Sequence, residues 1–193
     1  MSTTAFKHGN REAWLLAAVD ALAPIFKAAD VVPVSEVAVS CGWPSKAIRR
    51  RIGECWPTKS SNDSRAHLFV SPTLADPVEI LGVLAHELIH AIDDCQNGHH
   101  GPFARMARGI GLAGKLTATV PGETLKPQLV KLAADLGPYP HGGLNIALSG
   151  RKTEGTRMLK VECPSCGYVV RTTAKWLAFG LPTCPCGEDM VQT

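Results

Sequence analysis

The chain has 193 residues, 45% of them hydrophobic, a composition that excludes a disordered protein and allows a buried core. Lys and Arg number 20 against 17 Asp and Glu, and the net charge of +3 is only a mild hint of an acidic partner such as nucleic acid. No segment resembles a signal peptide or a membrane span of about 20 apolar residues, so we expect a cytoplasmic protein without a membrane partner.

The N-terminal part of the chain predicts one helix followed by three strands. Apolar residues recur with a period near 3.6 from Asn10 to Ala29, which indicates an amphipathic helix. Val-rich or alternating patterns then predict strands, with a polar loop over residues 58–65 before the last of them; the strands are expected within residues 34–41, 48–56 and 66–71.

A long apolar run, Val78 to Ile92, predicts a buried helix that begins with Asp76 as N-cap and Pro77 at its first position. Further helices are expected over residues 102–111 and 125–136, with a short extended piece over 117–120 between them. From Gly137 to Gly155 the composition turns to Gly, Pro and polar residues, which is typical of a linker. We therefore expect a domain at 1–140, a linker at 141–157 and a small module at 158–193.

The segment His86-Glu87-Leu88-Ile89-His90 lies inside the buried helix. Residues four apart share one helix face, so both imidazoles can bind one cation, and Glu87 is placed to take a proton from a water that zinc activates. The alternative is a pair of core histidines with satisfied hydrogen bonds. Two His and a Glu in an apolar helix are costly to bury without a purpose, which favours the metal site.

A catalytic zinc ion needs a third protein ligand. The position six residues after His90 is Gln96, and Glu123 stands in a Pro-Gly-Glu turn rather than a helix. His99 and His100, which follow Gly98, are the better candidates, and the spacing alone leaves both open.

Four cysteines near the C-terminus form the pairs Cys163-Pro-Ser-Cys166 and Cys184-Pro-Cys186. Two such pairs predict a closed, tetrahedral structural zinc site. A module this small needs a bound metal ion for stability, because it is too small for a hydrophobic core of its own. Residues 168–176 between the pairs have the Val and Thr content of a strand. Cys41, Cys55 and Cys95 have no such pairing and are expected to be plain buried thiols.

The histidine motif, followed by Gly98-His99-His100-Gly101-Pro102-Phe103, resembles the SprT-like zinc metallopeptidases, which include the Spartan DNA–protein-crosslink proteases. The resemblance implies an α+β fold: a minimal zincin-like domain, with a small sheet packed on the active-site helix, and a C-terminal zinc ribbon. It also favours His99 as third ligand, because His99 follows Gly98 and precedes Phe103 by four residues. Residues 66–72 would be a sheet strand, and an edge strand there would bind an extended peptide.

The resemblance thus implies a zinc endopeptidase with Glu87 as general base, two zinc ions and a protein substrate associated with DNA. The alternative is a nucleic-acid-binding or transcription-associated accessory protein that works through the ribbon. Basic side chains on or near the ribbon exceed acidic ones by two: Arg151, Lys152, Arg157, Lys160, Arg171 and Lys175 against Glu154, Glu162, Glu188 and Asp189. Its aromatic side chains are candidates for base stacking. They are Tyr168, Trp176 and Phe179.

The sequence leaves the roles of three further polar residues undecided. Asp93 or Asp94 would hydrogen-bond a ligand imidazole, or else belong to a solvated helix end. His67, in the third expected strand, is interpreted as structural rather than catalytic.

Overall fold

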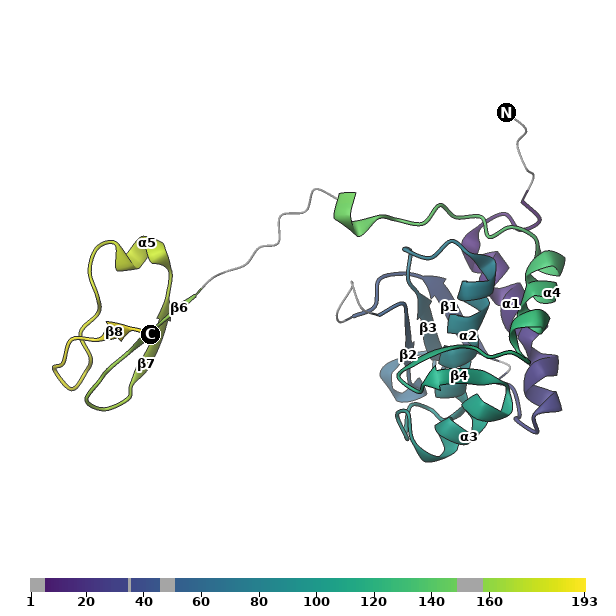
Figure 1. Cartoon of the computed structure of the whole chain (residues 1–193), viewed down its shortest axis with the longest axis horizontal. Coiled ribbons are helices and arrows are strands. Elements are labelled where there is room, and N and C mark those ends of the chain that lie inside the picture. The colour runs from purple at the N-terminus through teal and green to yellow at the C-terminus, as the bar shows by residue number, and fades with distance from the viewer. Residues whose placement is uncertain (1–5, 35, 46–50, 149–157) are drawn as a thin grey trace. The chain divides into compact units, whose positions relative to one another are not determined.

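The computed structural model describes residues 6–34, 36–45, 51–148 and 158–193, and the chain divides into two compact units, Met1–Leu148 and Ser149–Thr193 (Figure 1). Helices combine with small sheets, which confirms the mixed α+β class. The first unit extends past the expected boundary at 140, because His141 Nε2 lies 2.8 Å from the Pro72 carbonyl oxygen and Leu144 N–H donates to the same oxygen. Residues 149–157 of the expected linker lie outside the described residues.

The first unit contains a three-stranded sheet of order β1-β3-β2, built from β1 (Val37–Cys41), β2 (Gly53–Trp56) and β3 (Ala66–Val70). β3 pairs in parallel with β1 and antiparallel with β2. The expectation that residues 66–72 form an edge strand is therefore wrong, and the free edges belong to β1 and β2. Residues 48–50 of the second expected strand lie outside the described residues.

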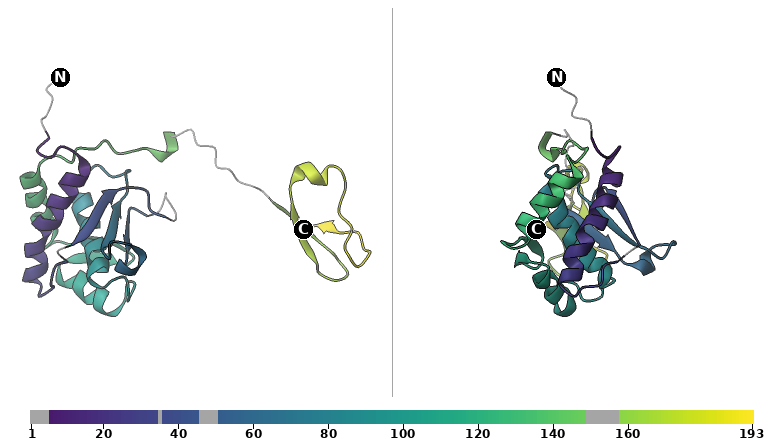
Figure 2. Two further views of the ribbon diagram at one scale, coloured as in Figure 1. Left: turned by 180° about the vertical axis from the view of Figure 1, so that it is seen from behind. Right: turned by 90° about the vertical axis from the view of Figure 1, so that its right-hand side faces the viewer.

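Two helices, α1 (Arg11–Ala28) and α2 (Pro77–Ile92), pack against this sheet, and α4 (Lys126–Leu136) packs against both of them. Figure 2 shows the helices on one side of the strands. Asn10 caps α1 by accepting from Ala13 N–H, and Asp76 caps α2 by accepting from Glu79 N–H, both at 2.8 Å. Among the described residues, no helix is long and apolar enough to cross a membrane.

The core of the first unit lies between the sheet and these helices. The face of β3 that carries Leu68 is buried, as the alternating burial of a half-covered sheet requires, while His67 and Phe69 point to the other face. α2 is the most deeply embedded helix: Ile80, Leu81, Leu84, Ala85 and Ile89 are fully buried. The side chains that α2 carries are therefore held with little freedom.

α3 (Gly101–Gly109) is followed by a hairpin of β4 (Leu112–Lys115) and β5 (Ala118–Pro121), where the sequence indicated one short extended piece. Short helices over Thr58–Ser60 and Ile146–Leu148 complete the unit. β4 was missed because its Leu-Ala-Gly-Lys sequence lacks both an alternating pattern and strand-forming side chains.

The second unit holds a small antiparallel sheet of order β7-β6-β8, formed by β6 (Leu159–Glu162), β7 (Val169–Thr172) and β8 (Val191–Gln192). The sequence suggested a strand that continues to Trp176, but Trp176 lies in the short helix α5 (Ala174–Leu177). The fully enclosed core is tiny: Val161, Cys163, Cys184 and Met190. So few apolar groups do not hold a unit of this size together by themselves.

Trp14 tests the core of the first unit. Its side chain has no exposed surface, packs edge-to-face on Tyr139 and donates its indole N–H to the Gly137 carbonyl oxygen at 2.9 Å. Trp14→Ala should lower the free energy of unfolding by about 3–5 kcal/mol. Urea unfolding followed by circular dichroism measures this. Leu16→Ala, on the same helix but at a side chain that is 50% exposed, is the control and should change stability by less than about 0.5 kcal/mol.

Candidate metal centres and active site

Three imidazoles converge at the surface of the first unit. His86 and His90 project from one face of α2, one turn apart, and His99 comes from the segment between α2 and α3. His99 Nε2 lies 3.3 Å from His86 Nε2 and 3.2 Å from His90 Nε2. His100 is the N-cap residue of α3 and does not belong to this group.

Hydrogen bonds between the rings do not account for this geometry. A ring nitrogen carries either one proton or one lone pair, so His99 Nε2 satisfies at most one of its two contacts as a hydrogen bond. A cation at the centre satisfies all three nitrogens at once. With metal–nitrogen bonds of the length found for zinc, tetrahedral ligand nitrogens lie about 3.3–3.4 Å apart, close to the spacing observed. The three histidines are therefore a group that could bind a metal ion.

Burial keeps these imidazoles neutral, which is the form that binds metals. It lowers the pKa of His86 to about 3 and that of His90 to about 4, helped by the neighbouring histidines, and it lowers the pKa of His99 as well. Phe103 of α3 packs against all three imidazoles: its fully buried ring stacks on His90 with centroids 4.3 Å apart, and its centroid lies 5.0 Å from those of the other two rings. An apolar contact thus helps to fix the positions of the three rings.

Thr119 of β5 supports the site from the side, a role that the sequence did not reveal. Its hydroxyl lies 2.8 Å from His86 Nδ1. If Nδ1 carries the proton and donates to Thr119 Oγ1, Nε2 keeps its lone pair for a metal. No spacing rule connects a threonine on a hairpin to a histidine 33 positions earlier, so only the fold shows this contact.

Asp93 and Asp94 do not bind the histidine rings. Asp93 accepts from Asn97 N–H at 2.7 Å, and Asp94 accepts from Thr58 N–H at 2.7 Å and from Thr58 Oγ1 at 3.1 Å. They shape the segment that leads to His99. The His67 ring likewise lies within hydrogen-bonding distance of Ser61 and Asp63 on the outer side of the sheet, at 3.1 and 3.2 Å.

Glu87 stands next to the histidine group and is only 6% exposed. Burial raises the pKa of this carboxyl group to about 8, with contributions from the negative charges of Cys95 and Glu54, while Arg51 opposes the shift. β2 reaches the carboxylate at Gly53. A Cβ there would collide with Glu87 and come within 2.7 Å of Val83 Cγ1, so glycine is required for this close approach.

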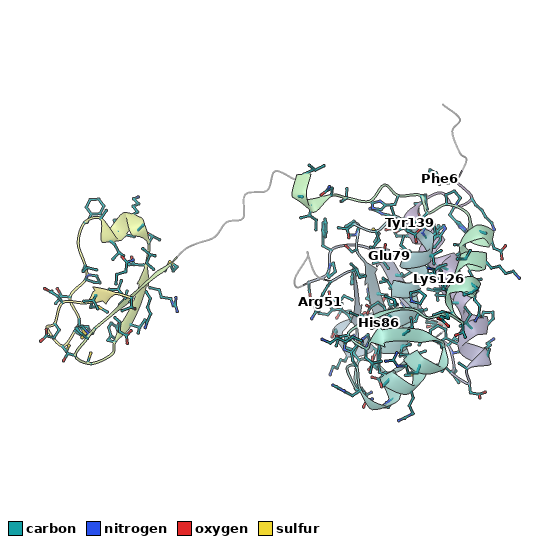
Figure 3. The ribbon with its side chains drawn as sticks, in the orientation of Figure 1. Phe6, Arg51, Glu79, His86, Lys126 and Tyr139 are labelled. Carbon is teal, nitrogen blue, oxygen red and sulfur yellow. The ribbon has the colours of Figure 1, made fainter. Side chains whose placement is uncertain are left out.

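A cleft of about 660 Å³ contains the three histidines and Glu87. Its walls are β2 on one side and the tip of the β4–β5 hairpin on the other, with α2 as the floor. Two lining residues, Arg51 and His86, are labelled in Figure 3. The histidine group is therefore reached from an open groove large enough for an extended chain.

Cys55 and Cys95 also line this cleft, which corrects the expectation that they are plain buried thiols. Cys95 Sγ lies 3.6 Å from the Cys55 carbonyl oxygen, and Cys55 Sγ lies 3.8 Å from the Trp56 carbonyl oxygen. The neighbouring Cys95 side chain raises the pKa of Cys55, with burial adding to the effect, and the neighbouring Cys55 side chain lowers the pKa of Cys95. Cys41 is separate and lies beside Tyr139.

The second unit brings its four cysteines together. Cys163 Sγ lies 3.6 Å from Cys186 Sγ, and Cys166 Sγ lies 3.4 Å from Cys184 Sγ. These distances are far beyond a disulfide bond and near the value of about 3.8 Å for sulfurs around a tetrahedral zinc ion. The cysteines form a second group that could hold a metal ion.

Both cysteine pairs end in a glycine with a left-handed backbone, Gly167 at φ 74° and Gly187 at φ 96°. These turns let backbone N–H groups point at sulfur. The Cys166 N–H donates to Cys163 and, with further donors, lowers the pKa of Cys163 to about 7. Cys184 accepts from the Cys186 N–H, yet burial and the neighbouring thiols raise its pKa to about 12. Four thiols this close do not all ionise without a cation.

Comparisons of the chain with protein-family models, with curated proteins and with solved structures found no match. What the chain does is therefore inferred from the geometry of its two sites.

Thr119→Val should weaken metal binding at the histidine site by about 10- to 100-fold, because it removes the hydroxyl that fixes the His86 ring. Competition with a chromophoric chelator measures the affinity. Thr117→Val changes an exposed threonine two residues away on the same hairpin and should leave the affinity unchanged. Equal affinities for wild type and Thr119→Val would show that the contact has no part in metal binding.

Proposed function

We propose that the chain is a zinc-dependent endopeptidase. One observation carries the proposal: a buried carboxylate, Glu87, stands beside three converging imidazoles at the bottom of an open cleft. A purely structural metal site has no use for a carboxylate next to a vacant ligand position. Three protein ligands and an accessible fourth position are the arrangement of catalytic zinc sites, whereas the four cysteines suit a closed structural zinc site.

His86, His90 and His99 would hold a zinc ion, which would supply Lewis acidity to a peptide carbonyl and lower the pKa of water to about 7. Glu87 does the proton work. Its carboxylate takes a proton from the attacking water and later passes it to the leaving amine. Burial raises the pKa of the Glu87 carboxyl group, so Glu87 holds a proton more tightly than an exposed glutamate does.

The free edge of β2 provides a place for the substrate backbone. Just after β3, Ser71 N–H donates to the Ile52 carbonyl oxygen at 2.9 Å, so the backbone polar groups of Ile52 point toward β3. These groups alternate in direction along a strand. Gly53 and Cys55 therefore turn their N–H and C=O groups away from β3 and toward the cleft. An extended peptide paired with this edge would lie across Glu87 and the histidine group.

These features fit the resemblance to the SprT-like family, including a zincin-like first unit and a zinc ribbon as the second. On this basis we propose that the substrates are proteins associated with DNA. The pairing edge is β2 rather than the strand at residues 66–70.

Glu87→Gln should keep both zinc ions but lower the rate of cleavage of a denatured protein substrate by about 10²- to 10⁴-fold, because glutamine keeps the shape without accepting a proton. Metal content by atomic emission and cleavage by gel assay measure the two effects. Glu79→Gln, at an exposed position in the first turn of the same helix, should cleave at the wild-type rate. A wild-type rate for Glu87→Gln would refute the mechanism.

The second unit favours another function, binding of single-stranded nucleic acid. Trp176 is 60% exposed and Phe179 is 82% exposed, their ring centroids lie 6.1 Å apart, and the Lys175 ammonium lies 5.1 Å from the centre of the Trp176 ring. Tyr168 is exposed as well. Residues 158–193 carry equal numbers of basic and acidic side chains, so stacking rather than net charge would drive this binding. Arg151, Lys152, Glu154 and Arg157 lie outside the described residues.

Trp176→Ala combined with Phe179→Ala should lower affinity for a single-stranded oligonucleotide by about tenfold or more, because each stacked base contributes about 1–3 kcal/mol. Fluorescence anisotropy measures the affinity. Trp43→Ala removes a similarly exposed tryptophan from the first unit and is the control. Unchanged affinity in the double variant would rule out these rings as the binding surface.

A further inference from the structure

Two thiols from distant parts of the chain meet at the wall of the cleft. Cys55 lies inside β2, and Cys95 follows the end of α2. Their residues are 40 positions apart, yet Cys95 Sγ lies 3.6 Å from the Cys55 carbonyl oxygen. The contact places the two cysteines next to each other in the fold, as a disulfide bond requires of its partners.

The segment that carries Cys95 is fastened from both sides. Asp94 accepts two hydrogen bonds from Thr58, just beyond the end of β2, and Cys95 N–H donates to the His90 carbonyl oxygen at 2.8 Å. Asp94 and Cys95 both adopt left-handed backbone conformations, with φ of 46° and 56°. Non-glycine residues adopt them only where the surrounding contacts enforce them. The position of the thiol is thus specified by the fold.

Neither metal group uses these two cysteines. The histidine group contains no sulfur, and the other metal-binding group takes its four cysteines from the second unit. Both residues line an open cleft and both are only half-buried. Cys41 offers a contrast, because the groups around its thiol are Tyr139, Arg11 and Glu12.

We propose that Cys55 and Cys95 are a reversible oxidation site, which a peroxide converts to an intramolecular disulfide bond. One thiolate attacks a peroxide oxygen, breaking the O–O bond and forming a sulfenic acid as the first water leaves. The second thiol attacks the sulfenic sulfur and releases the hydroxyl group as a second water. Two thiols and one hydrogen peroxide thus give one disulfide and two waters, and a dithiol reductant reverses the change by exchange.

The bond would join the free edge of β2 to the segment between His90 and His99. Cys55 presents backbone groups to the cleft, and Cys95 already covers its carbonyl oxygen. Covalent closure fixes that cover in place, so less of the edge remains for an extended peptide. This consequence, lower peptide turnover in the oxidised protein, rests on the proposed peptidase function, whereas the oxidation itself does not.

The test uses the wild-type, zinc-loaded full chain treated with hydrogen peroxide, alkylated and digested with trypsin without reduction. Residues 52–59 and 66–105 are then tryptic peptides with a single cysteine each, Cys55 and Cys95. Mass spectrometry should find the two peptides linked, and dithiothreitol should separate them. Recovery of both peptides unlinked, as alkylated thiols or as sulfinic acids, would overturn the proposal.

Matched variants test specificity and consequence. Cys41→Ser should retain the linked peptides and the peroxide sensitivity of turnover, whereas Cys95→Ser should lose both when compared with its own reduced form. Linked peptides with unchanged turnover would overturn the proposed effect on the cleft. Linked peptides in a chain that cleaves nothing when reduced would support the oxidation site and overturn the peptidase, so the two failures are distinguishable.

Discussion

Three imidazole nitrogens that meet at one point, two from the face of α2 and one from the segment after it, are the constraint around which the site of the first unit is arranged. Without a cation, the His99 nitrogen has two contacts and the means to satisfy one of them. The neighbouring elements hold this arrangement instead of relieving it. Phe103 supports the rings from α3, Thr119 fixes His86 from the hairpin, and Gly53 lets β2 approach Glu87. Side chains held in place in this way lose little conformational entropy when they bind a metal ion.

The two metal groups stand in different relations to their units. The first unit has a large apolar core that includes Trp14, Leu68 and Phe103, so its fold does not depend on the histidine site. Among its described residues, the second unit has a buried cluster of four side chains, two of which are the candidate ligands Cys163 and Cys184. For such a unit, metal binding and folding are largely the same event. Removal of the metal ions by a chelator should therefore inactivate the histidine site and unfold the second unit.

Local patterns predicted those parts of the molecule that are set by local geometry. The spacing of His86 and His90, the caps of α1 and α2 and the cysteine pairs each depend on a few neighbouring residues. What the sequence did not reveal depends on the arrangement of distant segments. The central place of β3 follows from the spatial order of strands, which chain order does not fix. The contacts of Thr119, Gly53 and Cys95 join segments tens of residues apart, and no periodicity marks them.

The hairpin of β4 and β5 has a double role that follows from the bond between Thr119 and His86. If His86 Nδ1 donates to Thr119, this hydrogen bond would make His86 Nε2 a better electron donor to a metal ion held by the three histidines. A peptide that displaces this wall of the cleft would then change the affinity for the ion. Occupancy of the groove and metal affinity would in that case be thermodynamically linked through one hydroxyl group, and by reciprocity each would alter the other.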